Sequence, residues 1–256
     1  MNRGFKTVVA VSVFCLWAAA SHGAGSVAVA AAANLTHFLG PLDAAFLKKY
    51  PDVAIRAETG ASGSLVTQIA NGAPYDVFLS ADTEYPRHLA EMGPAPRESV
   101  VTFAYGRLVL FTGRSEINLT TVEDVVRDSR VLRIAIANPK SAPYGRAAEE
   151  ALGNLAILDL ARPRFVYGEN ITQTAQFVAS GNADVGFVAM SLVVAPAMAQ
   201  TGRWIEVPSS LYTPIAQGAV LTAKGRTNPE ARRYLEFLTG PEAQSLFRNF
   251  GYGLPN

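Results

Sequence analysis

The segment VAIRAETGASGSLVTQIANGAPYDVFLSA, residues 53–81, determines the fold class that we predict for this chain. Its two ends, 53–58 and 76–81, are short apolar runs of the kind that form buried strands. Between them Leu65, Val66 and Ile69 recur at helical spacing. A strand, a helix and a second strand in this order predict a parallel βαβ unit.

The same alternation extends along most of the chain. Candidate strands lie at 26–33, 53–58, 76–81, 106–112, 132–137, 164–168, 184–190, 203–207 and 216–222. With helices between them, they predict an α/β fold of mostly parallel sheets in two lobes. The division falls near VVTFAYG (100–106), and two C-terminal helices, from Asn228-Pro229 to Phe250, return to the first lobe. Lobe one is then 25–105 and 214–256, and lobe two is 106–213.

The first 24 residues resemble an export signal. Arg3 and Lys6 precede the uncharged run from Val8 to Ala20, and small residues follow. A membrane anchor is the alternative, although the run is short for a membrane span. Removing Arg3 and Lys6 from the 22 basic residues leaves 20 against 21 acidic ones. The exported protein then also loses Cys15, its single cysteine.

Composition excludes some classes of protein. The chain has 256 residues, of which 49% are hydrophobic and 17% charged, which is typical of a globular protein. A net charge of +1 argues against a nucleic-acid-binding protein, which would present a basic face.

Four predicted helix starts follow strands and share one form. Asn34 begins a helix with Leu35 and Phe38 on one face, Ser62 precedes Leu65, Tyr144 follows Pro143, and Ile171 follows Asn170. Helix starts carry unpaired N–H donors and a partial positive charge. In open α/β sheets, loops at the carboxyl ends of strands line the ligand crevice. If the four starts converge, they form a site for a small anion.

Each start also has a simpler explanation. Every helix needs a cap, so Ser62 or any one of the others could serve only that purpose. Asn34, Asn118 and Asn170 also match the N-x-T glycosylation pattern, but capping explains two of them more simply.

We find no signature of an enzyme. After the signal, only His37 and His88 remain as histidines, and neither lies in a nucleophile or metal motif. GASGS is not a nucleophile elbow, because Ser64 stands where the second glycine is required. Asp76 and Asp82 flank a predicted strand, where capping or surface roles are expected. We therefore assign no catalytic residue, no cofactor and no metal site of the chain's own.

An ordered set of motifs resembles the periplasmic molybdate-binding proteins of ABC transporters. The set is AAANLT, GASGSLVTQI, DVFLSAD, NPKSAPYGRAAEEAL, GENITQTAQFV, DVGFVA and FRNFGY, and it covers nearly the whole exported chain. The resemblance implies the type II periplasmic-binding-protein fold, with two α/β lobes joined by hinge strands. It also implies a monomer that captures molybdate or tungstate in the periplasm and delivers it to a membrane permease.

The resemblance further implies a ligand set. Asn34 and Ser62 would give side-chain and backbone donors from lobe one, and Tyr144 and Ile171 mainly backbone N–H groups from lobe two. Molybdenum would be held only as the oxyanion. Two positions depart from many members, which carry Ser where this chain has Ala33 and, in some, a Tyr donor where it has Ala189.

The alternative function is binding of another oxyanion, such as sulfate or phosphate. Molybdate is fully ionised near neutral pH and needs donors only, whereas phosphate carries a proton and gains from an acceptor carboxylate. None of the four positions is acidic, and we interpret the nearby Glu169 as a solvated loop residue. Selection against sulfate must then come from the size of the cavity.

Overall fold

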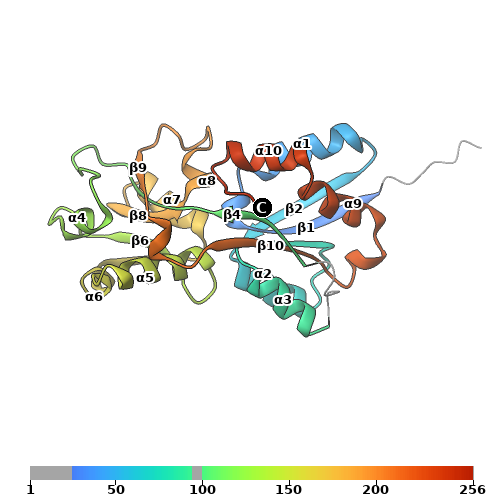
Figure 1. The fold of residues 1–256 in the computed structure, drawn as a ribbon, viewed down its shortest axis with the longest axis horizontal. Coiled ribbons are helices and arrows are strands. Elements are labelled where there is room, and N and C mark those ends of the chain that lie inside the picture. The colour runs from blue at the N-terminus through green and yellow to red at the C-terminus, as the bar shows by residue number, and fades with distance from the viewer. Residues whose placement is uncertain (1–24, 94–99, 256) are drawn as a thin grey trace, which may run out of the picture.

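The computed structural model describes residues 25–93 and 100–255, arranged as two lobes (Figure 1). The predicted signal segment 1–24, with Cys15, lies outside the described residues. Within the described part of the chain, no helix has the length and apolar character needed to span a membrane.

Each lobe is built on a five-stranded sheet. The first sheet has the order β2-β1-β3-β10-β4 and the second the order β7-β6-β8-β5-β9. The first comprises β1 (Ser26–Ala32), β2 (Ala54–Gly60), β3 (Val77–Ser80), β4 (Val101–Gly106) and β10 (Ile215–Leu221). The second comprises β5 (Leu108–Thr112), β6 (Ile134–Ala137), β7 (Phe165–Gly168), β8 (Val185–Ala189) and β9 (Arg203–Glu206).

One strand in each sheet runs against the other four. β10 is antiparallel to both of its neighbours, β3 and β4, and β5 is antiparallel to both β8 and β9. The pairs β1–β2, β1–β3, β6–β7 and β6–β8 are parallel. The predicted α/β fold is confirmed, but both sheets are mixed, because the one reversed strand in each lies between two strands of the opposite direction.

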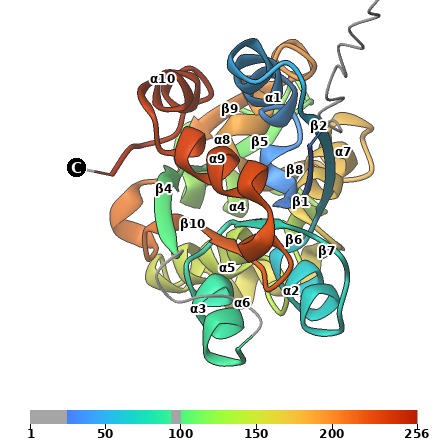
Figure 2. The same ribbon diagram turned by 90° about the vertical axis from the view of Figure 1, so that its right-hand side faces the viewer.

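Helices cover both faces of the first sheet, with α1 and α10 on one side and α2 and α3 on the other (Figures 1 and 2). The helices of this lobe are α1 (Leu39–Lys49), α2 (Ser62–Ala70), α3 (Glu84–Glu91), α9 (Pro229–Leu238) and α10 (Pro241–Asn249). The helices of the second lobe are α4 (Val122–Arg127), α5 (Pro143–Asn154), α6 (Leu158–Ala161), α7 (Ile171–Ala179) and α8 (Met190–Val193).

The alternation of β1 explains this sandwich. Val27 and Val29 pack into the apolar cluster under α1, α9 and α10, whereas Ala30 packs with Leu65 and Ile69 of α2. Successive side chains of a strand point to opposite faces, so an apolar strand buries both. The two C-terminal helices pack on this sheet, where Leu238 and Phe247 are fully buried.

The chain passes between the lobes twice. β4 ends at Gly106 and β5 begins at Leu108, and the chain returns between β9 and β10. The stretch 100–106, near which we placed the division between the lobes, therefore contains the edge strand of the first sheet.

The helix predicted from Asn34 onward is interrupted. Residues Ala33–Leu35 form a 3-10 turn, and α1 starts only at Leu39. Pro41 consequently lies in the first turn of α1, where a missing N–H breaks no helical hydrogen bond. The turn at Ala33–Leu35 is thus separate from α1 and lies at the interface between the lobes.

Candidate functional site

Four segments that follow strands meet between the two lobes. The first sheet contributes the turn after β1 and the start of α2, and the second sheet the starts of α5 and α7. They line a cavity with about 190 Å³ of space between and above the lining atoms, part of it open to solvent. It is lined by Ala32, Ala33, Asn34, Gly60, Ala61, Ser62, Ala81, Ala142, Pro143, Tyr144, Asn170 and Ile171. The structure therefore brings together all four residues that the sequence singled out.

Ser62 is the first residue of α2 and does not cap it. The N-cap is Ala61, and no side chain caps this helix. The Ser62 Oγ instead accepts a hydrogen bond from the Ala81 N–H at 3.0 Å. Its own hydroxyl hydrogen and N–H have no acceptor among the described residues. The simpler explanation, that Ser62 only caps a helix, is therefore wrong.

Asn34 offers its backbone rather than its side chain. Its Nδ2 donates to Gln217 Oε1 at 2.9 Å and to the Tyr252 hydroxyl at 2.7 Å, so both amide hydrogens are committed. Gln217 fixes this orientation, because its own Nε2 donates to the Ala81 and Ile215 carbonyls. The expected side-chain donation from Asn34 to a ligand is absent from this arrangement. Its N–H, in the middle of the 3-10 turn, has no protein acceptor among the described residues.

Tyr144 is the second residue of α5, directly after Pro143. Proline at a helix start leaves its neighbour's N–H as the first free donor of that helix. The Tyr144 ring is buried, and its hydroxyl has no hydrogen-bond partner among the described residues. Burial raises the pKa of this phenol well above its usual range, so the hydroxyl stays neutral.

Ile171 begins α7 beside a true cap. The side chain of Asn170 accepts from the Gln173 N–H at 3.0 Å, which confirms the capping role for Asn170. Because the cap satisfies the third helical N–H, the Ile171 N–H at the start of the helix remains available.

No charged side chain is among the residues that line the cavity in the described chain. Glu169 is exposed, as predicted, and its N–H is held by Gln173 Oε1. Asp76 is buried and accepts from the Ala28 N–H and Lys224. His37 and His88 are also absent from the lining. Among the described residues no group of three or more His, Cys, Asp or Glu side chains could hold a metal ion.

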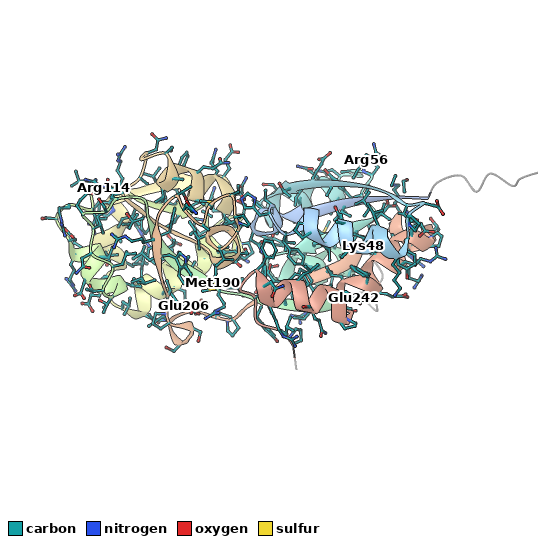
Figure 3. The ribbon with its side chains drawn as sticks, turned by 90° about the horizontal axis from the view of Figure 1, so that it is seen from above. Lys48, Arg56, Arg114, Met190, Glu206 and Glu242 are labelled. Atoms are coloured by element: carbon teal, nitrogen blue, oxygen red, sulfur yellow. The ribbon has the colours of Figure 1, made fainter. Side chains whose placement is uncertain are left out.

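The lobes are in direct contact around this cavity. The Gly63 N–H donates to the Ser141 carbonyl at 2.9 Å, and the Thr172 hydroxyl donates to the Ala33 carbonyl at 2.8 Å. Asp82 of lobe one forms an ion pair with Arg146 of lobe two. Met190 lies at the junction of the lobes in Figure 3, where it packs against Gly251. The structure is thus a closed form.

This arrangement suits a small, fully ionised anion. Three helix starts and one turn, which carry unpaired N–H groups and a hydroxyl, line a space without carboxylates. A hydrogen bond to a charged group contributes about 1.5–3 kcal/mol, and donors held in place need no reorganisation.

Comparison with known proteins agrees with this geometry. The family model described as bacterial extracellular solute-binding protein matches residues 27–253. The chain belongs to this family. This solute-binding protein is 38% identical to the molybdate-binding protein ModA of Azotobacter vinelandii over 97% of both chains. It is 41% identical to ModA of Rhodobacter capsulatus over 90% of this chain and 88% of the relative.

The fold of the solute-binding protein is also similar to that of a relative whose structure has been solved. The periplasmic molybdate-binding protein of Azotobacter vinelandii superposes with a TM-score of 0.84 and 34% identity, over 90% of this chain and 100% of that one. The resemblance to this family and the type II fold predicted from the sequence are confirmed.

The residues that fix Asn34 in place by hydrogen bonds were not identified from the sequence. Gln217 and Tyr252 bind the Asn34 amide, and the Ser191 hydroxyl donates to the Asn34 carbonyl at 2.8 Å. Gln217 gave a usable signal, since it is a polar residue inside the apolar strand run 216–222. Thr172 and Ser191 gave none, because their partners lie more than a hundred residues away.

Proposed function

We propose that this solute-binding protein captures molybdate and delivers it to the permease of an ABC transporter. The observation that carries the proposal is the uncharged cavity where four donor segments from both lobes converge. Relatives named for molybdate binding, at 38% and 41% identity, support molybdate as the ion.

In this proposal Asn34, Ser62, Tyr144 and Ile171 hold the oxyanion. Ser62 supplies its N–H and hydroxyl, and the other three supply backbone N–H groups. Molybdenum is bound only as the oxyanion, and tungstate, with the same charge and shape, is a second ligand. The lobes, taken as 25–105 with 214–256 and as 106–213, open and close about the two crossings near Arg107 and 206–215.

The absence of a carboxylate from the lining disfavours a protonated ligand such as phosphate. A protonated oxyanion presents a donor, and the described lining has no charged acceptor for it. Sulfate is excluded by size, since a donor that stands too far from a smaller ion forms a poor hydrogen bond.

The proposal also covers the place and manner of action. The protein acts in the periplasm after removal of residues 1–24, as a monomer, and needs neither a cofactor nor nucleic acid. It is a carrier and not an enzyme, which is supported by the relatives named as molybdate-binding proteins. The permease recognises the surface that the two lobes form together in the closed state.

Calorimetric titration of the exported chain with molybdate, tungstate, sulfate and phosphate tests the function. We expect tight one-to-one binding of molybdate and tungstate and binding of sulfate and phosphate that is weaker by orders of magnitude. Equal or tighter binding of sulfate or phosphate would overturn the proposal.

A further inference from the structure

The donors that face the cavity come in two pairs, one member from each lobe, and each pair is accompanied by a direct bond between the lobes. Asn34 and Ile171 form one pair, next to the Thr172 hydroxyl bond to the Ala33 carbonyl at 2.8 Å. Ser62 and Tyr144 form the other pair, near the Gly63 N–H bond to the Ser141 carbonyl at 2.9 Å.

The first bond acts on the same peptide unit as a ligand donor. The Ala33 carbonyl and the Asn34 N–H are the two ends of one planar trans peptide. The oxygen also accepts from the Thr36 N–H at 3.1 Å and the Thr36 hydroxyl at 2.7 Å, so lobe one already holds the peptide in place. Thr172 docks lobe two onto this fixed turn, and donation to the oxygen further polarises the N–H at the opposite end.

Thr172 is the neighbour of Ile171 in the first turn of α7. Because the Thr172 hydroxyl is hydrogen-bonded to the Ala33 carbonyl, the length of this bond limits how close the start of α7 can come to the turn of lobe one. The neighbouring carbonyl, that of Asn34, is held in the same manner by the Ser191 hydroxyl from α8 and the Tyr252 hydroxyl from lobe one. Neither Thr172 nor Ser191 is among the residues that line the cavity.

At the bond between the Gly63 N–H and the Ser141 carbonyl, steric contact prevents a closer approach of the two lobes. A Cβ on Gly63 would lie 3.0 Å from the Ser141 Cα, so the backbones of α2 and of the loop before α5 are already at closest approach. The lobes are therefore stopped by contact with each other on both sides of the cavity.

We infer that Thr172 is a specificity-determining residue, which together with the Gly63–Ser141 contact sets the gap between the lobes. The inference rests on the proposed oxyanion function and adds to it the origin of selectivity. The protein and not the ion fixes the width of the closed cavity, so the lobes cannot tighten around a smaller tetrahedral dianion such as sulfate.

The test compares three variants by calorimetry with molybdate and with sulfate. Thr172→Val removes the hydroxyl at nearly constant shape, Thr172→Ser restores it, and Thr201→Val is the control, since the Thr201 hydroxyl donates to the Met198 carbonyl within lobe two. We expect Thr172→Val to lower molybdate affinity about 3- to 10-fold, the equivalent of one hydrogen bond. Sulfate affinity should change much less, because an ion too small for the fixed gap gains little from closure of the lobes. The ratio of the two affinities therefore falls.

Thr172→Ser should restore the ratio, and Thr201→Val should leave it as in the parent protein. The melting temperature of the unliganded protein should be the same for Thr172→Val and the parent, because the bond forms only on closure. An unchanged affinity ratio in Thr172→Val, with molybdate still bound by the parent protein, would overturn this inference alone. Failure of the parent protein to bind any of the oxyanions would overturn the proposed function and the inference with it.

Discussion

Gly63 of the first lobe touches Ser141 of the second so closely that a side chain on its α-carbon would crowd the backbone of the second lobe. Its N–H is 2.9 Å from the Ser141 carbonyl oxygen, and a Cβ would lie 3.0 Å from the Ser141 Cα. A Cβ would also lie 2.7 Å from the Tyr85 hydroxyl, but that group is the end of a side chain and can move. The glycine is therefore required by the closed form and not by its own helix.

Gly63→Ala should separate closure from stability. Alanine favours a helix over glycine by about 1 kcal/mol, so the unliganded protein should unfold at the same or a higher temperature. Crowding in the closed form costs about 1–3 kcal/mol, which lowers molybdate affinity about 5- to 150-fold. Calorimetry and thermal unfolding measure the two effects.

Gly153→Ala is the matched control, because it places the same methyl group on α5 with no atom within 4 Å. It should stabilise the protein without a change in affinity. If Gly63→Ala bound molybdate as tightly as Gly153→Ala, the contact with Ser141 would have no part in closure.

Ser62→Ala should weaken molybdate binding about 10-fold or more, because a hydrogen bond to a charged group is worth about 1.5–3 kcal/mol. The variant also leaves the Ala81 N–H without its acceptor, so we expect a loss of stability of about 1 kcal/mol. Titration calorimetry gives the first effect and chemical denaturation the second.

Ser64→Ala, an exposed position two residues along the same helix, is the control for Ser62→Ala. Both quantities should stay at parent values in it. A Ser62→Ala protein with parent affinity would show that the hydroxyl does not contact the ion.

The ion pair between Asp82 and Arg146 should contribute modestly to closure. Arg146 is partly exposed, so water and salt weaken the attraction, and the Arg146→Ala variant should bind molybdate only about 2- to 5-fold less tightly in dilute buffer. The difference should shrink at high salt. Arg233→Ala, which breaks a pair with Glu230 inside lobe one, should not alter affinity at any salt concentration. A salt-independent effect of Arg146→Ala would contradict an electrostatic origin.

Asp184 makes the stability of the second lobe depend on pH. Burial by itself raises the pKa of this carboxyl, but the N–H groups of Arg133 and Leu132 and the guanidinium of Arg114 outweigh burial, and the pKa is lowered overall. A lowered pKa in the folded state stabilises the protein above the unfolded value of about 3.9, and this contribution is lost as the pH falls through the folded value.

Asp184→Asn should therefore reduce the free energy of unfolding by about 1–3 kcal/mol at pH 7, and by progressively less in acid. Denaturant melts between pH 3 and pH 7 measure this difference. Glu123→Gln, which affects an exposed pair with Arg127 on α4, should cost less than about 0.5 kcal/mol throughout. A constant difference for Asp184→Asn across this range would show that the charge is not what stabilises the native state.

The sequence predicted the strands and the four donor segments because both depend on local patterns. The apolar run that forms β1 and the small residues before α2 are visible without knowledge of the fold. The orientation of the Asn34 amide could not be predicted, since Gln217 and Tyr252 reach it from distant parts of the chain. The break before α1 was missed because Leu35 and Phe38 keep helical spacing across it, and both are fully buried.

The edge strand β4 was overlooked for a related reason. Val101 to Gly106 continues almost directly into β5, so the two strands read as one apolar segment, although they belong to different sheets. Pairing with β10, which is far away in the sequence, makes β4 an edge strand of the first sheet.

The strands of the first sheet come from two distant parts of the chain, and this affects the order in which the molecule folds. Strand β3 lies beside β10, with Leu79 opposite Ala219, so the sheet lacks its fourth and fifth members until most of the polypeptide has been made. The second sheet is drawn from one continuous stretch, and contacts between nearby residues form faster than distant ones. We expect amide protons of β6 and β8 to gain protection from exchange before those of β3 during refolding. A refolding chain would then organise its middle first and join its two ends last.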